Sequence, residues 1–121
     1  MSCLFNSLQH FLPPDSNQTR QAICDYLEAN QPIIDGISTR VILNLENPNY
    51  IPLMRHGSTW GGAIEIQAAC NIWNTSVVVH DIRRVNQDGK DVAIQFIPVK
   101  STYNKEIHIN WNGGHYTPRL N

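Results

Sequence analysis

Two residues near opposite ends of the chain have the side chains that covalent catalysis needs. Cys3 stands at the start of an amphipathic segment, and His115 follows Gly113-Gly114 close to the other end. A cysteine thiolate is a strong nucleophile, and a neighbouring histidine can take up the thiol proton and later return it. We interpret Cys3 and His115 as a nucleophile and its base, held as a thiolate–imidazolium pair, which only the fold can bring together.

The residues around Cys3 predict one buried helix. Apolar side chains recur there at helical spacing, at Leu4, Leu8 and Phe11. Ser2 can cap this helix, and Pro13-Pro14 cannot continue it. Cys3 would then lie in the first turn, where unpaired backbone N–H groups and the helix dipole favour a thiolate and can bind an oxyanion. Taken alone, however, a cysteine on such a helix is more often a packing residue.

The composition predicts one domain, residues 1–121, of ordinary globular type. The chain has 121 residues, of which 41% are hydrophobic, and a formal net charge of −1. It has no basic block, no apolar run of about 18 residues and no secretory signal. We therefore expect no nucleic-acid partner, no membrane partner and a cytoplasmic monomer.

The cysteines and histidines do not have the spacing of a metal site. Three cysteines, an odd number without a CxxC pair, favour a reducing compartment over a disulfide framework. The five histidines lack zinc-ligand spacing, so we expect no metal and no cofactor. Cys24 and Cys70 are expected to pack in the core and to react more slowly than Cys3.

Helical patterns fill the first part of the chain and strand patterns fill the rest. We expect further helices over residues 15–30, 38–45, 50–55 and 63–73, with caps at Asp15 or Ser16, at Ser38, and at Ser58 or Thr59. Alternating and β-branched residues then predict strands over 75–79 with an extension to 85, and over 91–99, 105–111 and 115–120, with a hairpin turn at 86–90. This order indicates an α+β fold with a largely antiparallel sheet.

The pattern gives structural interpretations to several polar and aromatic residues. Arg20 falls early in a helix, where a solvated or snorkelling side chain is the usual outcome. Glu65 and Gln67 are expected to face water from their helix. Trp60, before Gly61-Gly62, is expected to give packing support rather than to form a cleft wall, because tryptophan is mostly buried by area.

Several stretches, taken in order, are similar to those of a known enzyme family. They are residues 3–8 (CLFNSL), Arg20 with residues 26–30 (YLEAN), residues 54–68 (MRHGSTWGGAIEIQA) with the strand at 75–79, and residues 107–110 (IHIN) with 114–116 (GHY). Each stretch alone is a weak signal, but their order and spacing cover nearly the whole chain. In this combination the chain resembles the OTU (ovarian tumour) cysteine proteases, whose characterised members are mostly deubiquitinases.

The resemblance implies a papain-like (OTU-type) α+β fold in which N-terminal helices pack on a small, largely antiparallel sheet. It implies that Cys3 and His115 hydrolyse the bond after ubiquitin's C-terminal glycine through a thioester, without metal or cofactor. The partner would be ubiquitin, polyubiquitin or a ubiquitin-like modifier, in the cytoplasm, or in a host cytosol if the protein is a pathogen effector. Cleft walls or their structural support would come from Trp60, Gly61, Gly62 and Tyr116.

Two departures from the family pattern leave alternatives open. The family has Asp-Gly-Asn or similar before the cysteine, where this sequence has Met1-Ser2, and often Asn or Asp two residues after the histidine, where it has Thr117. The group that orients His115 could be Thr117 or Asn112. A catalytically impaired, ubiquitin-binding pseudoenzyme of the same fold is therefore the main alternative to an active deubiquitinase. A third candidate is another papain-like hydrolase, such as a peptidoglycan amidase, which the Trp-Gly-Gly motif fits poorly.

Overall fold

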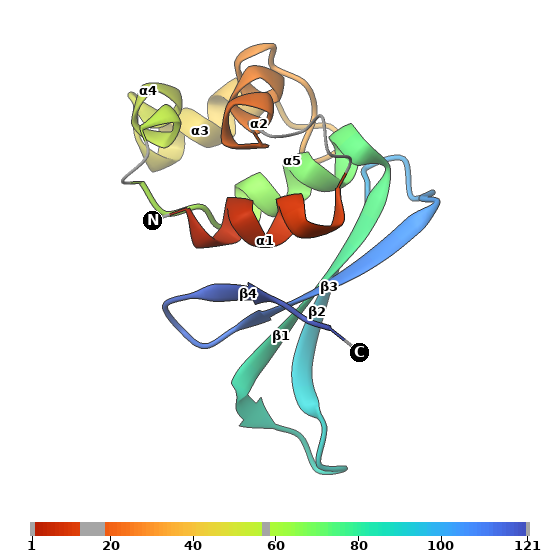
Figure 1. The fold of residues 1–121 in the computed structure, drawn as a ribbon. Helices are drawn as coiled ribbons and strands as arrows, with labels where there is room; N and C mark the ends of the chain where they lie inside the picture. Colours follow the sequence, from red (N-terminus) through yellow and green to blue (C-terminus); the bar gives the residue numbers. More distant parts are fainter. Residues whose placement is uncertain (1, 13–18, 57–58, 121) are drawn as a thin grey trace.

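The computed structural model describes residues 2–12, 19–56 and 59–120. Within these ranges the helices are α1 (Cys3–Phe11), α2 (Thr19–Glu28), α3 (Thr39–Glu46), α4 (Tyr50–Arg55) and α5 (Ala63–Trp73). The strands are β1 (Thr75–Val85), β2 (Asp91–Phe96), β3 (Lys105–Trp111) and β4 (Tyr116–Pro118). The helices gather at one end of the molecule, and the β1–β2 hairpin extends away from them (Figure 1).

The strands form one mixed sheet in the order β2-β1-β3-β4. Strands β1 and β2 are an antiparallel hairpin, and Asn86 N–H donates to Lys90 O at 2.9 Å across its turn. Strands β3 and β4 are also antiparallel, whereas β1 and β3 at the centre run parallel, with Val77 beside Ile107. The α+β fold class and the hairpin are confirmed. The parallel pairing of the two central strands was not indicated by the alternating sequence pattern.

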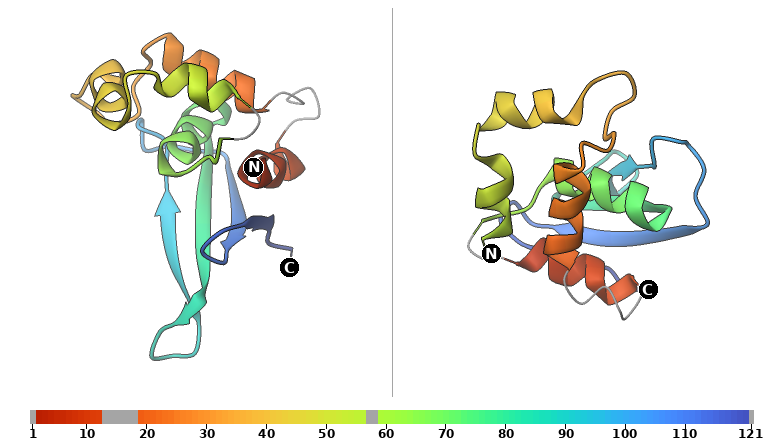
Figure 2. Two further views of the ribbon diagram at one scale, coloured as in Figure 1. Left: turned by 90° about the vertical axis from the view of Figure 1, so that its left-hand side faces the viewer. Right: turned by 90° about the horizontal axis from the view of Figure 1, so that it is seen from above.

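Helix α1 lies between α2 and strands β3 and β4 (Figures 1 and 2). It packs on β3 and β4 on one side and on α2 on the other. Leu4, Phe5 and Leu8 are each at most 3% exposed, so the predicted apolar stripe is the buried face of this helix. Helix α5 packs on β1 and β2 and also contacts α2. Helices α1 and α5 thus share one hydrophobic core with the sheet.

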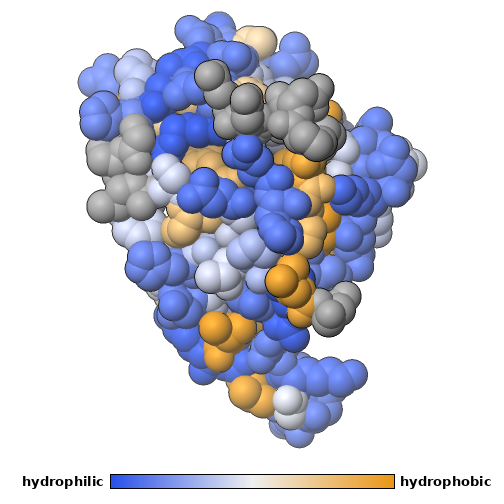
Figure 3. Space-filling model, in the orientation of Figure 1, coloured by the Kyte–Doolittle hydropathy of each residue, from blue (hydrophilic) through white to orange (hydrophobic). Residues whose placement is uncertain are grey.

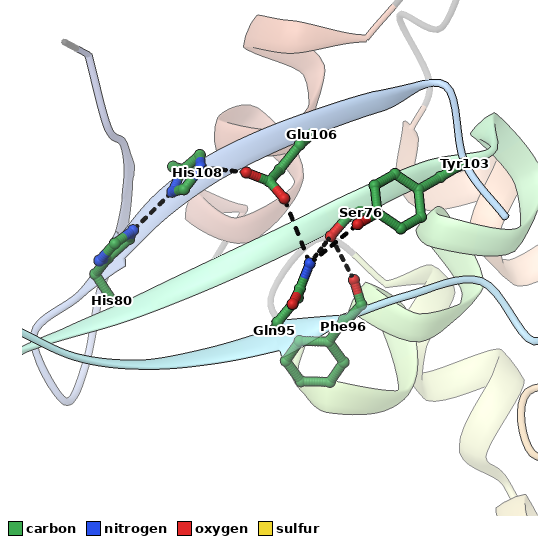
Figure 4. Close-up of polar contacts among 7 residues, drawn as sticks. All are labelled: Ser76, His80, Gln95, Phe96, Tyr103, Glu106 and His108. Carbon is green, nitrogen blue, oxygen red and sulfur yellow. Dashed lines mark hydrogen bonds and ion pairs between the residues drawn. The ribbon is translucent and has the colours of Figure 1, made fainter. Parts of the chain in front are cut away.

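The opposite face of the sheet carries a chain of polar contacts (Figure 4). His80 Nε2 on β1 lies 2.8 Å from His108 Nδ1 on β3, and His108 Nε2 lies 3.1 Å from Glu106 Oε2. If the His80 Nε2–H donates to His108 Nδ1, then the proton of the His108 ring lies on Nε2 and is donated to Glu106. Gln95 on β2 continues the chain by donating to Ser76 Oγ at 3.0 Å and to Glu106 Oε1 at 3.3 Å.

Helix α5 begins differently from the expectation. Gly62 stands at the cap position, and its N–H donates at 2.8 Å to Oε1 of Glu65, which also accepts a 2.5 Å hydrogen bond from the Tyr50 hydroxyl at Oε2. Thr59 is therefore not the cap, and Glu65, at 1% exposed, does not face water. The predicted cap was wrong because the carboxylate of Glu65, inside the helix, accepts the hydrogen bond of the Gly62 N–H at the helix start.

Arg20 and Gln67 also depart from their solvent-facing interpretation. Arg20 is only 8% exposed, because neighbouring segments supply hydrogen-bond acceptors for its guanidinium. Gln67 is half-buried and donates to Ile97 O at 2.8 Å, which ties α5 to the segment after β2. The expected caps at Asp15, Ser16 and Ser58 lie outside the described residues.

The surface seen in Figure 3 is mainly hydrophilic, with hydrophobic residues in small groups. Exposed apolar side chains elsewhere in the described chain include Leu45 on α3 and Ile94 on β2. Among the described helices, none has the length and apolar character needed to cross a membrane.

Truncating Leu8 should test the packing of α1. We expect Leu8→Ala to lower the free energy of unfolding by about 2–5 kcal/mol, because a fully buried leucine leaves a cavity when shortened. Urea denaturation measures the change. Leu45→Ala, at an 82% exposed position, is the control and should change stability by at most about 0.5 kcal/mol. Equal effects of the two variants would contradict a buried α1.

The histidine chain predicts loss of stability in acid. Burial, helped by nearby Arg119 and His108 and opposed by Asp91, lowers the pKa of His80 below its ordinary value. The unfolded chain then binds the extra proton as the pH falls through about 6.5, so the His80 contribution is complete above that pH and declines toward pH 5. Thermal unfolding between pH 7.5 and 5 should show this decline.

His80→Gln keeps a side-chain donor toward His108 and removes the titrating group. We expect its melting temperature to depend less on pH than that of the wild type, while His10→Gln, at an exposed position outside this network, follows the wild type. Glu106 and His108 are present in both proteins, so the difference between them isolates His80. Identical pH dependence in all three proteins would contradict the assignment.

Candidate active site

Cys3 is the first residue of α1, and its position follows from how that helix begins. Ser2 occupies the cap position, and its carbonyl accepts the Asn6 N–H at 2.8 Å. The Ser2 hydroxyl makes no cap hydrogen bond, and instead accepts one from Arg20 at 3.4 Å. The half-buried Cys3 sulfur accepts the backbone N–H of Tyr116 at 3.5 Å, so the start of the first helix contacts the start of the last strand.

His115 stands at the end of a tight turn between β3 and β4. Asn112 Oδ1 accepts the backbone N–H groups of Gly114 at 3.0 Å and of His115 at 2.7 Å, and Gly113 supplies the positive φ of 99° that this turn needs. The Asn112 N–H donates to His115 O at 3.1 Å. The His115 side chain is exposed, directly before the residue whose N–H reaches Cys3.

In the part of the chain that the structure describes, no hydrogen bond joins the His115 ring to Asn112 or Thr117, the two expected orienting residues. The Asn112 side chain binds the turn backbone, and Thr117 lies in β4 opposite Asn110 with an exposed side chain. Within the described ranges, the side-chain neighbour of the His115 imidazole is Trp60, whose ring lies 5.4 Å away between centroids at an interplanar angle of 59°. An aromatic ring, rather than a carboxylate or hydroxyl, therefore faces this histidine.

Trp60 is a surface residue of the site and not a core residue. It is 44% exposed, which differs from the packing support that its residue type suggested. The following Gly61 lies so close to α1 that a Cβ there would be 2.8 Å from Leu4 Cδ2 and 2.9 Å from Phe5 Cζ. Only glycine allows this approach, so Gly61 brings Trp60 to the edge of α1 beside His115.

A cleft of about 380 Å³ opens beside this pair of rings. Its walls are formed by residues of the Trp-Gly-Gly segment and of the β3–β4 turn, namely Trp60, Gly61, Trp111, Gly113, Gly114 and Tyr116. The Arg83 guanidinium lies 4.3 Å from the Trp111 ring centroid and is held by two 2.9 Å hydrogen bonds to Asp81. A Cβ at Gly113 would meet Arg83 at 2.9 Å, so this arginine also packs against the turn that carries His115.

The three cysteines have different surroundings. Cys24 and Cys70 are fully buried, and burial raises the pKa of the Cys24 thiol to about 11 and that of Cys70 to about 12. Cys3 is partly accessible at a helix N-terminus, where the dipole stabilises negative charge. Burial is the main cause that raises the pKa of Tyr116, and the nearby Cys3 adds to it, so the phenol stays neutral beside the site.

The described part of the chain contains no cluster of three or more histidine, cysteine or acidic residues that could hold a metal ion. The sequence predicted Cys3 and His115 as the reactive pair and residues 112–114 as a turn, but it did not indicate the contact of Arg83 with Trp111 or the hydrogen bonds of the Asn112 side chain within that turn. An Asn-Gly-Gly sequence before a histidine is a turn signal that could have suggested the Asn112 contacts.

Comparisons with known proteins show the family of this chain. The family model for OTU-like cysteine proteases matches residues 2–117. Curated relatives include the proteins named ubiquitin thioesterase OTU1 from Mus musculus, 27% identical over 125 residues, and from Drosophila melanogaster, 24% identical over 120 residues. Both alignments cover 97% of this chain but 33% and 32% of the relatives, so the chain spans about a third of their length.

A solved structure supports the fold. The viral OTU domain protease from Dera Ghazi Khan virus matches with a TM-score of 0.66 and 19% sequence identity, covering 97% of this chain and 72% of the viral chain. The arrangement of helices on a mixed four-stranded sheet is thus one that an OTU protease also adopts.

Alkylation should separate the three thiols. We expect iodoacetamide at neutral pH to label Cys3 first, because the thiolate is the reactive form and the other two thiols are buried with raised pKa values. Peptide mapping after timed quenching measures the three rates. Labelling in denaturant is the control and should bring all three to similar rates, whereas faster native labelling of Cys24 or Cys70 would contradict Cys3 as the nucleophile.

Proposed function

Because the chain belongs to the OTU-like cysteine protease family, we propose that it is a deubiquitinase that hydrolyses the bond after ubiquitin's C-terminal glycine. The observation that carries the proposal is the 3.5 Å contact between the Cys3 sulfur and the N–H of Tyr116, the residue after His115. This contact supports the proposed pair, because it joins Cys3 to the segment that carries His115. The names of the curated relatives, ubiquitin thioesterases, support ubiquitin as the substrate.

In the first half of the proposed reaction, the isopeptide is cleaved. The Cys3 thiolate attacks the carbonyl carbon of the C-terminal glycine, and the carbonyl π electrons move onto oxygen. Backbone N–H groups in the first turn of α1 stabilise this oxyanion, because they have no partners within the helix. The oxyanion then collapses, the C–N bond breaks, and the His115 imidazolium donates its proton to the departing lysine amine.

In the second half, water releases ubiquitin from the thioester. Neutral His115 takes a proton from a water molecule as its oxygen attacks the thioester carbonyl. The second tetrahedral intermediate expels the Cys3 thiolate and leaves the ubiquitin carboxylic acid, which gives its remaining proton to solvent and becomes the carboxylate. The thiolate–imidazolium pair is restored, and neither step needs a metal or a cofactor.

The cleft beside Trp60 suits a chain end without side chains. Two of its walls are themselves glycine backbone, at Gly61 and at Gly113-Gly114. Ubiquitin's Gly-Gly tail has no Cβ atoms, so it can pass between such walls where other residues would collide. Tyr116 and Trp111 line the same cleft and offer apolar contact along the tail.

We extend the proposal to organisation and location. Residues 1–121 would act as one catalytic domain, as a monomer, on ubiquitin, polyubiquitin or a ubiquitin-like modifier, with neither nucleic acid nor membrane as a partner. A cytoplasmic location, or a host cytosol for a pathogen effector, suits three free thiols, because reducing compartments keep cysteines unpaired.

Hydrolysis of a ubiquitin C-terminal fluorogenic amide tests the proposal. We expect wild-type turnover, loss of activity below detection for Cys3→Ala, and a decrease of about 10²- to 10⁴-fold for His115→Ala, because the base also supplies the leaving-group proton. Cys24→Ala and the exposed His10→Ala are the matched controls, and both should retain activity.

Two outcomes would contradict the proposal. Undiminished hydrolysis by Cys3→Ala would exclude Cys3 as the nucleophile. Binding of ubiquitin by the wild type without any turnover, measured by calorimetry, would instead favour the pseudoenzyme of the same fold.

A further inference from the structure

Arg20 is a buried cation that contacts several separate segments of the chain. Its Nη1 donates to Met54 O and to Thr59 O, both at 2.8 Å, and its Nη2 lies 3.4 Å from Ser2 Oγ. The guanidinium also lies over the Phe5 ring, 4.2 Å from its centroid. One side chain from α2 therefore connects the start of α1, the end of α4 and the segment before α5.

The contacts of Arg20 adjoin both halves of the candidate active site. Ser2 directly precedes Cys3, so its hydroxyl contact fixes the entry of the chain into the nucleophile helix. The Thr59 carbonyl belongs to the planar peptide unit that leads into Trp60, whose ring lies 5.4 Å from that of His115. Arg20 thus contacts the residue that precedes Cys3 and the residue that precedes Trp60.

The Trp60 segment is also held from its other end. The Gly62 N–H donates to the buried carboxylate of Glu65, and Gly61 packs directly on Leu4 of α1. Trp60 therefore stands between two fixed peptide units, one bound by Arg20 and one by Glu65. Because Trp60 is 44% exposed, the core does not fix its position, and these backbone anchors do.

Simple helix packing does not require a guanidinium at this position. Removing a charge from water is costly unless hydrogen bonds replace the lost solvation, and an apolar side chain could fill the same space between helices. Arg55 shows the other use of an arginine between α2 and α4: it forms ion pairs with Asp25 at 2.8 Å and Glu28 at 2.6 Å. Those contacts link the two helices and do not reach the Trp60 segment.

We propose that Arg20 is a positioning residue for catalysis, which holds Trp60 against His115 and fixes the backbone that enters Cys3. The inference rests on the proposed function, since the reaction it serves is the attack of Cys3 assisted by His115. Among the described residues, the hydrogen bonds and ring contact given for Arg20 join it to Ser2, Phe5, Met54 and Thr59, and not to Cys3, His115 or the cleft lining. The effect of Arg20 is to fix the positions of the Cys3 and His115 side chains relative to each other, because displacements of about 1 Å can lower the rate by up to about 100-fold.

Kinetics of three arginine variants test this proposal, at a temperature where circular dichroism shows each protein folded. We expect Arg20→Gln to lower kcat for the ubiquitin amide by about tenfold or more with little change in KM, and to alter the pH profile of kcat/KM. Arg20→Lys keeps the charge but not the planar fork, so it should recover only part of the rate. Arg55→Gln, the matched control, should lower the melting temperature but leave kcat and the pH profile unchanged.

A second pair of variants keeps the proposal testable if Arg20→Gln does not fold. If Arg20 acts through Trp60, then Trp60→Ala should reproduce the fall in kcat, and adding Arg20→Lys to it should cost little more, because the two changes remove the same constraint. Additive effects on kcat, or an unchanged kcat and pH profile in Arg20→Lys and Trp60→Ala, would overturn the proposal.

The iodoacetamide rate of Cys3 separates failure of this inference from failure of the proposed function. If wild-type protein does not hydrolyse the ubiquitin amide, the function fails, but a slower Cys3 alkylation in Arg20→Lys than in Arg55→Gln would still support the positioning role. If wild-type protein is active and the Arg20 variants match Arg55→Gln in both readouts, the inference fails and the function stands.

Discussion

The contact between the first helix and the last strand is the constraint on which the site depends. The proposed nucleophile Cys3 and the proposed base His115 can meet only if α1 is fixed against β4, and the Tyr116 N–H donates to the Cys3 sulfur where the two elements touch. Helix α1 is held there by burial on two sides, against β3 and β4 below and α2 above in the view of Figure 1. Leu8, with no exposed surface, lies in this double contact, so core packing and active-site geometry rest on the same helix.

Buried polar groups add direction to this packing. Hydrophobic burial has no preferred orientation, whereas the hydrogen bonds of Arg20 and Glu65 fix particular peptide units. Burial raises the pKa of Glu65, and the hydrogen bonds from Tyr50 and Gly62 oppose that effect by favouring its charged form. The segment before α5 thereby has a defined path, although its tryptophan side chain is largely exposed.

Local patterns were sufficient for most elements, and distant contacts account for the rest. The bounds of α4, α5 and β3 follow the predicted segments, because periodicity and turn residues act within a few positions. The parallel pairing of β1 with β3 could not be inferred, since two buried apolar strands show the same alternation in either direction. Fold class was therefore accessible from sequence, while strand order was not, and Cys3 and His115 stay the predicted reactive pair.

Arg20 and Trp60, two of the residues that the sequence misplaced, share one property, which is a partner far along the chain. Arg20 was assigned to solvent, but its acceptor at Thr59 is 39 positions away. Trp60 was assigned to the core from its residue type, whereas its ring neighbour is His115. Neither contact leaves a trace in a local pattern, so only the assembled fold identifies them.

Covalent capture by ubiquitin with a C-terminal electrophile is the most direct test that Cys3 and ubiquitin belong to one reaction. We predict a single adduct of one ubiquitin per chain in the intact mass, mapped to Cys3, absent in Cys3→Ala and slower to form in His115→Ala. An adduct on Cys24 or Cys70, or no adduct from a protein that still binds ubiquitin, would contradict the account.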